Sequence, residues 1–142
     1  MSVFENITPI YTQALAEIHR KCFEVYWDEK AFLDLILLPT SVGLVCDKGF
    51  ILCSKVLDEA EILTVCVLPD SRRQGIASSL LSQMADELKK QGIKNLFLDV
   101  DEQNKSAISL YEKNGFLFVS RRKGYYHTKN GVSDALIYKK EL

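Results

Sequence analysis

The clearest pattern of apolar and polar positions along the chain lies between Ala60 and Lys90. Residues 60–67 form a mostly apolar, β-branched run of strand length, which ends at Leu68-Pro69-Asp70. After a short loop with one glycine, apolar side chains recur at helical spacing, at Ile76, Ala77, Leu80, Leu81, Met84, Ala85 and Leu88. The pattern predicts a strand, a tight loop and a helix that buries one face.

The rest of the chain predicts helices before this unit and strands on both sides of it. Helices are predicted from a Thr8 N-cap to about Lys21, and from an Asp28 N-cap to a point before Pro39. A further short helix is predicted over residues 104–113, and strands over residues 3–7, 43–46, 50–56, 95–101, 116–119 and 134–138. Residues 47–49 predict a hairpin turn with Gly49 at positive φ, and residues 121–127 a connection between the last two strands.

This order of elements, β-α-α-β-β-β-α-β-α-β-β, predicts an α/β fold built on one mixed sheet with helices on both faces. The strands that flank the long helix should be parallel, whereas hairpin strands should be antiparallel. A length of 142 residues is typical of one domain, so we expect residues 1–142 to form a single unit.

Composition and charge exclude several classes of protein. The net charge is −1, with 47% hydrophobic and 26% charged residues, which is typical of a soluble globular domain and gives no sign of a nucleic-acid or membrane partner. The first residues lack the basic and apolar regions of a secretory signal. Cys22, Cys46, Cys53 and Cys66 have no metal-binding spacing, so we expect reduced thiols, no metal and a cytoplasmic protein.

The loop before the long helix has the arrangement of an anion-binding site. A helix that follows such a loop presents unpaired backbone N–H groups at the positive end of its dipole. Small residues would let an anionic group approach that backbone closely, so residues 71–78 predict a phosphate cradle. Many helices begin after a glycine and bind nothing, and the prediction therefore depends on the combination of strand, loop and helix.

Three other features are candidates for chemistry. Asp99 lies in a strand with alternating apolar residues, so its carboxylate needs either a partner or a catalytic role. Asn104 and Tyr111 share one face of the short helix, which is equally compatible with core packing. The aromatic pair Tyr26-Trp27, between the first two helices, suits either the edge of the core or a substrate contact.

Two motifs resemble those of a known enzyme superfamily. Arg72-Arg73-Gln74-Gly75-Ile76-Ala77 matches the Q/R-x-x-G-x-G/A signature of the GNAT (GCN5-related) N-acetyltransferases. Asn104-x-x-Ala107-x-x-x-Tyr111-x-x-x-Gly115-Phe116 matches the second motif of that superfamily, and the order of elements agrees over nearly the whole chain. Residues 110–116, 121–126 and 134–137 resemble the RimI-like branch, whose members acetylate the N-terminal α-amine of a ribosomal protein.

The resemblance implies acetyl-CoA as cosubstrate, held in a V between the central strand and the next one. The implied contacts are the backbone of Val65, Cys66 and Val67, the loop residues Arg72, Arg73, Gln74, Gly75, Ile76, Ala77 and Ser78, and the side chain of Asn104. Tyr111 is the implied acid for the departing thiolate. The implied acceptor contacts are Tyr26, Trp27, Tyr125 and Tyr126.

The base is the point at which this sequence departs from the RimI-like pattern. Asp99 stands where those enzymes carry a glutamate, and it is shorter by one methylene. We expect Asp99 to act as the base through a water molecule, with Glu61 and His127 as the alternatives.

Three functions are compatible with these residues. The first is acetylation of a protein or peptide N-terminus by direct attack of the amine, with a ribosomal protein as a candidate acceptor and a monomer or weak dimer as the expected state. The second is acetylation of a small amine, an antibiotic or a lysine side chain. The third is a non-catalytic acetyl-CoA-binding module, which Asp99 in place of glutamate favours and Tyr111 disfavours.

Overall fold

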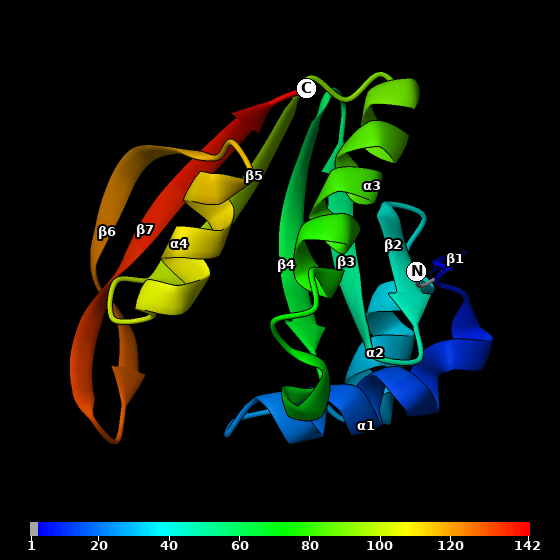
Figure 1. Cartoon of the computed structure of the whole chain (residues 1–142), viewed down its shortest axis with the longest axis horizontal. Coiled ribbons are helices and arrows are strands. Elements are labelled where there is room, and N and C mark those ends of the chain that lie inside the picture. The colour runs from blue at the N-terminus through cyan, green and yellow to red at the C-terminus, as the bar shows by residue number, and fades with distance from the viewer. Residues whose placement is uncertain (1–2) are drawn as a thin grey trace.

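The computed structural model describes residues 3–142, which fold into one seven-stranded mixed sheet packed against α-helices (Figure 1). The strands are β1 (Glu5–Asn6), β2 (Ser41–Cys46), β3 (Gly49–Val56), β4 (Glu59–Val67), β5 (Asn95–Asp101), β6 (Leu117–Thr128) and β7 (Gly131–Glu141). The helices are α1 (Thr12–Cys22), α2 (Glu29–Ile36), α3 (Ile76–Lys90) and α4 (Lys105–Lys113). Their order along the chain is the predicted one.

The sheet has the strand order β1-β2-β3-β4-β5-β7-β6. Only the pair β4–β5, joined through α3, is parallel, and the other neighbours are antiparallel, as predicted. β4 and β5 pair only from Glu59↔Asn95 to Glu61↔Phe97. Beyond that point the two strands diverge, which opens the expected V (Figure 1).

A β-bulge in β4 explains why the pairing stops. Leu52 of β3 lies opposite Thr64, and Cys53 opposite Ile62, so Leu63 has no partner across the β3–β4 ladder. The extra residue reverses which side chains face α3: Ile62 does so before the bulge and Val65 after it. Because a bulge bends a strand and increases its twist, β4 turns away from β5 here.

Each face of the sheet carries its own hydrophobic core. One core joins α3 and α4 to the sheet, and its fully buried members include Leu80, Met84, Leu88, Leu96 and Leu98. The other lies under α1 and α2 and includes Leu15, Phe32 and Phe50. The apolar stripe predicted for α3 is therefore confirmed, as is the Asp28 N-cap of α2, whose Oδ1 accepts the Ala31 N–H at 2.9 Å. Within residues 3–142 no helix is long and apolar enough to cross a bilayer.

The predicted conformation of Gly49 was wrong, and the predicted Thr8 cap was only partly right. Gly49 does not adopt positive φ, and the turn consists of Asp47 and Lys48 because Cys46 pairs directly with Gly49. Glycine is required there by close packing: a Cβ at position 49 would lie 2.5 Å from the Cys66 carbonyl oxygen. Thr8 takes the predicted N-cap position before Pro9, but it caps a 3-10 turn at Pro9–Tyr11 that leads into α1, and its side chain makes no capping hydrogen bond.

The last two strands are much longer than predicted. Residues 121–127, which the sequence suggested were a connection, belong to β6. Their side chains are polar and give no alternating apolar pattern. β6 lies at the exposed edge of the sheet and is held by backbone pairing with β7 rather than by burial.

Candidate active site

The loop before α3 presents a row of backbone N–H groups to solvent. Backbone hydrogen bonds end at Arg72 N–H to Pro69 O and resume at Ser79 N–H to Gly75 O. Between them, in the part of the chain that the structure describes, the N–H groups have no backbone acceptor, and no side chain caps α3. Arg73 and Gly75 both adopt left-handed conformations, with φ of 64° and 78°. Such a loop suits an anionic group.

Open space lies beside this loop. A Cβ built on Gly75 meets no atom within 4 Å. A cavity of about 830 Å³ is lined by Phe4, Asp47, Lys48, Gln74, Gly75, Ile76, Ser78, Ser79, Ser82, Gln83 and Asn114. Asn114 Nδ2 donates to Ser78 Oγ at 3.1 Å and so ties the start of α3 to the end of α4. The loop and the cavity are therefore compatible with a phosphate-bearing ligand, and the cradle stays a prediction.

The edge of β4 that faces the V is without a strand partner beyond Glu61 among the described residues. At its end, the Val67 carbonyl accepts hydrogen bonds from Arg72 Nε at 3.1 Å and from Cys22 Sγ at 3.3 Å. Because these donors occupy the Val67 oxygen, an extended ligand on this edge would pair with other backbone groups, such as those of Val65, while Cys66 lies opposite Phe50 of β3. The Arg72 side chain folds back on β4 and its backbone N–H donates to Pro69 O, so the N–H groups without an acceptor in the described loop begin at Arg73.

Tyr111 of α4 is buried beside the V. Its ring meets Phe116 edge-on with centroids 5.9 Å apart. Burial raises the pKa of Tyr111 to about 12, with smaller contributions from Tyr126 and Cys66. The hydroxyl is therefore protonated at neutral pH and is available as a hydrogen-bond donor.

Asn104 is the N-cap of α4. Its Oδ1 accepts the Ala107 N–H and the Ser106 hydroxyl, both at 3.2 Å. The carboxamide oxygen is therefore committed to the helix, and the nitrogen is the atom that remains to reach a ligand.

Two carboxylates come from the two arms of the V. Glu61 pairs in register with Phe97, two residues before Asp99, so Glu61 and Asp99 lie on the face of the sheet opposite α3. Asp99 Oδ2 lies 3.5 Å from Arg122 Nη1 of β6. Burial and then the charge of Asp99 raise the pKa of Glu61, and Arg122 partly opposes this. Of the three residues considered as the base, the structure brings these two together, while His127 is exposed and pairs with Val132 near the end of the β6–β7 hairpin.

The four aromatic residues predicted to contact the acceptor have different surroundings. Tyr126 is half-buried, and burial followed by the charge of Asp99 raises its pKa to about 12. Tyr125 is exposed, and its ring lies 4.3 Å from the Arg122 guanidinium. Tyr26 is also exposed, whereas Trp27 packs into the core under α1, stacked 4.9 Å from His19.

Metal ligands are not grouped in this part of the molecule. No cluster of three or more His, Cys, Asp or Glu side chains within residues 3–142 could hold a metal ion.

A second groove of about 660 Å³ lies between α1 and β2 and is lined by residues that include Tyr11, Ile18 and Val45. None of the predicted site residues lines it.

Residues 12–116 match the acetyltransferase (GNAT) family. The chain belongs to this family. It is 34% identical to the "[Ribosomal protein bS18]-alanine N-acetyltransferase" of Escherichia coli K12 over 96% of the chain and 95% of that protein. It is 41% identical to the Salmonella typhimurium protein of the same name over 85% of the chain and 84% of that protein.

Solved structures agree with this assignment. The crystal structure of the Escherichia coli ribosomal-protein-S18-alanine N-acetyltransferase superposes with a TM-score of 0.90 at 31% identity, covering 99% of this acetyltransferase and 94% of that chain. Arabidopsis thaliana NAA60 in complex with acetyl-CoA, at 20% identity, has a TM-score of 0.87 over 100% of this chain and 99% of that one. At 20% identity, the similarity to NAA60 is evidence for the fold alone.

Two polar residues of the acetyltransferase were missing from the predicted site. Arg122 pairs with Asp99 and lies over Tyr125, and its place in the motif of residues 121–126 was the signal that could have identified it. Asn114 lies directly after the helix predicted over residues 104–113 and was not among the predicted site residues. Its partner Ser78 lies 36 residues earlier in the chain, so no local pattern could have indicated the contact.

Proposed function

We propose that this acetyltransferase transfers the acetyl group of acetyl-CoA to the N-terminal α-amine of a protein, with a ribosomal protein as the favoured acceptor. The observation that carries the proposal is the 34% identity, over 96% of the chain, to an enzyme whose name specifies the alanine of ribosomal protein bS18. A ribosomal acceptor would place the reaction in the cytoplasm.

The loop before α3 would hold the pyrophosphate of acetyl-CoA. Its unpaired N–H groups from Arg73 to Ser78 point to this role, and the positive end of the α3 dipole adds to it. The pantetheine arm would lie along the β4 edge that includes the backbone of Val65, and Asn104 Nδ2 would reach it from α4. The bound molecule supplies the thioester that the amine attacks.

Tyr111 would stabilise the departing thiolate. Because the pKa of Tyr111 is raised to about 12, well above the roughly 8.5 of a thiol, complete transfer of its proton to sulfur is unfavourable. Hydrogen-bond donation to the developing negative charge is the role that the buried hydroxyl supports.

Asp99 would accept the proton of the attacking amine through one water molecule, because its side chain is short. An α-amine has a pKa of about 8 and is already partly neutral at physiological pH, so only modest help is needed. Glu61 lies on the same face and is the alternative base.

A peptide panel tests the proposal. The enzyme is incubated with acetyl-CoA and an alanine-initiated ribosomal peptide, with the same peptide blocked at its N-terminus but carrying lysine, and with small amines. We expect turnover of the first alone. Preference for the lysine or the small amines would indicate the second function, and acetyl-CoA binding without any turnover would indicate a non-catalytic module.

A further inference from the structure

β6 changes its pairing at the point where it passes the V. Between the pairs Arg122↔Ala135 and Tyr126↔Ser133, β6 advances four residues while β7 advances two. The extra residues form a bulged segment, 123–125, which contains Gly124 at a φ of 65°. The conformation of the bulge determines where Tyr125 and Tyr126 lie, because Tyr125 belongs to the bulged segment and Tyr126 is the first paired residue after it.

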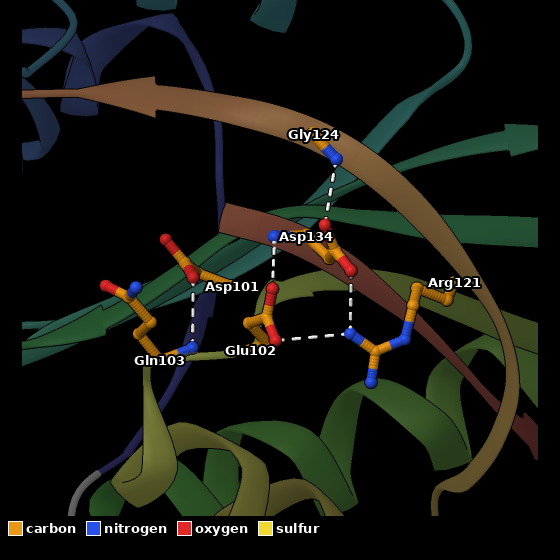
Figure 2. Close-up of polar contacts among 6 residues, drawn as sticks. All are labelled: Asp101, Glu102, Gln103, Arg121, Gly124 and Asp134. Atoms are coloured by element: carbon orange, nitrogen blue, oxygen red, sulfur yellow. Dashed lines mark hydrogen bonds and ion pairs between the residues drawn. The ribbon is translucent and has the colours of Figure 1, made fainter. Parts of the chain in front are cut away.

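One carboxylate holds this bulged segment in place. Asp134 Oδ1 accepts the Gly124 N–H at 2.8 Å, and Asp134 Oδ2 pairs with Arg121 Nη1 at 2.8 Å (Figure 2). The Gly124 N–H is the largest cause of the lowered pKa of Asp134, and Arg121 is the next, so this carboxylate is charged at neutral pH.

A second carboxylate links the same cluster to the turn before α4. Glu102 Oε1 lies 3.1 Å from the same Arg121 nitrogen, and Glu102 Oε2 accepts the Asp134 N–H at 2.5 Å (Figure 2). The Glu102 N–H in turn donates to the Asp134 carbonyl at 3.0 Å. The Glu102 and Asp134 side chains are partly exposed, at 33% and 22%, and that of Arg121 at 41%, so the cluster lies at the surface and is held by several contacts rather than by one buried pair.

We propose that Glu102, Arg121 and Asp134 are positioning residues for the acceptor, which fix the bulged segment of β6 against the start of α4. Tyr125 and Tyr126 are thereby held beside Asp99 and Arg122, while the same turn sets the origin of the helix that carries Tyr111. The inference rests on the proposed function, because it assigns the two tyrosines to the acceptor peptide.

Substitutions at Asp134 separate this role from general stability. Asp134→Leu removes both acceptor oxygens, whereas Asp134→Asn keeps Oδ1 for the Gly124 N–H. We expect Asp134→Leu to raise the KM for the acceptor peptide about tenfold or more, the scale of a lost hydrogen bond to a charged group, and Asp134→Asn to have a smaller effect. The KM for acetyl-CoA should stay within about twofold of wild type. Lys139→Gln, which alters an exposed ion pair of the same strand, is the matched control.

A second measurement does not depend on turnover. Hydrogen exchange at the Gly124 amide should be slow in wild type and in Asp134→Asn, and fast in Asp134→Leu, with backbone resonances of Tyr125 and Tyr126 shifting along with it. Unchanged exchange and resonances in Asp134→Leu would overturn the positioning role, whatever the acceptor. A peptide KM equal to wild type, or an equal loss toward peptide and acetyl-CoA, would also overturn it. Absence of peptide turnover by the wild-type enzyme would instead contradict the proposed function.

Discussion

Tyr111→Phe removes one hydroxyl from the site and leaves the aromatic packing against Phe116 in place. Folding and acetyl-CoA affinity should therefore survive, while the rate constant for acetyl transfer falls by roughly a hundredfold. Single-turnover kinetics measure this directly. Tyr138→Phe, which removes a hydroxyl bonded to Glu112 at 3.0 Å, is the matched control. A variant rate equal to wild type would remove Tyr111 from the mechanism.

Asp99→Asn keeps the size of the side chain but cannot accept a proton. If Asp99 is the principal base, the kcat of the Asp99→Asn variant should fall by roughly two to four orders of magnitude. Asp99→Glu should retain or improve activity. A raised acceptor KM with kcat intact would show that Asp99 only orients the amine. In that case Glu61→Gln becomes the variant that identifies the base.

Glu61 should also affect stability in a pH-dependent way. Because its pKa is raised in the folded protein, the ionised carboxylate lowers the free energy of unfolding at neutral pH. Glu61→Gln should therefore raise the melting temperature at pH 7. The gain should shrink as the pH falls and vanish below the ordinary value of 4.5, where both states carry the proton. Glu59→Gln on the same strand is the control, and a gain that persists at low pH would contradict this assignment.

At the level of the elements, the parts of the fold that depend on local sequence were predictable. α3 follows from its apolar spacing, and the Asp28 cap from one side chain and the N–H three residues later. The β4 bulge at Leu63 was not predictable, because it depends on the register with β3. The full extent of β6 was hidden by its polar residues, since an exposed edge strand requires no alternation of apolar side chains.

The candidate site follows the same division. Loop residues 72–78 and Tyr111 could be placed from motifs, because strand, loop and helix follow one another in sequence. The pairing of Asp99 with Arg122 and the cluster around Asp134 join segments that meet only through the β5–β7–β6 order of the sheet. Sequence patterns along one segment contain no information on such contacts.

The proposed role of the loop before α3 in acetyl-CoA binding can be tested by filling the open space beside it. Gly75→Trp should abolish acetyl-CoA binding, because the indole would occupy the open space beside the unpaired N–H groups. Gly92→Trp is a matched control, since Gly92 at the other end of α3 has a similar φ of 86° and equally open surroundings. Ser79→Ala should have little effect. If calorimetry shows Gly75→Trp binding as tightly as wild type, the cradle lies elsewhere.

For the whole molecule, the two cores explain how one sheet can bring two substrates together. The core under α3 and α4 positions the loop of the proposed phosphate cradle and Tyr111, while Glu61 and Asp99 lie on the opposite face. At the V between β4 and β5, no paired strands separate the two faces of the sheet, because the pairing stops after Glu61. In the proposed reaction, acetyl-CoA and the acceptor amine would meet in this opening for direct transfer.

The position of the acetyl group on the product peptide distinguishes transfer to the α-amine from transfer to lysine. A single alanine-initiated ribosomal peptide that also contains an internal lysine is incubated with acetyl-CoA and the enzyme, and tandem mass spectrometry assigns the added mass. We predict acetylation at the α-amine, strongly slowed in Tyr111→Phe. Acetylation at the lysine, or an unmodified peptide from an enzyme that binds acetyl-CoA, would contradict it.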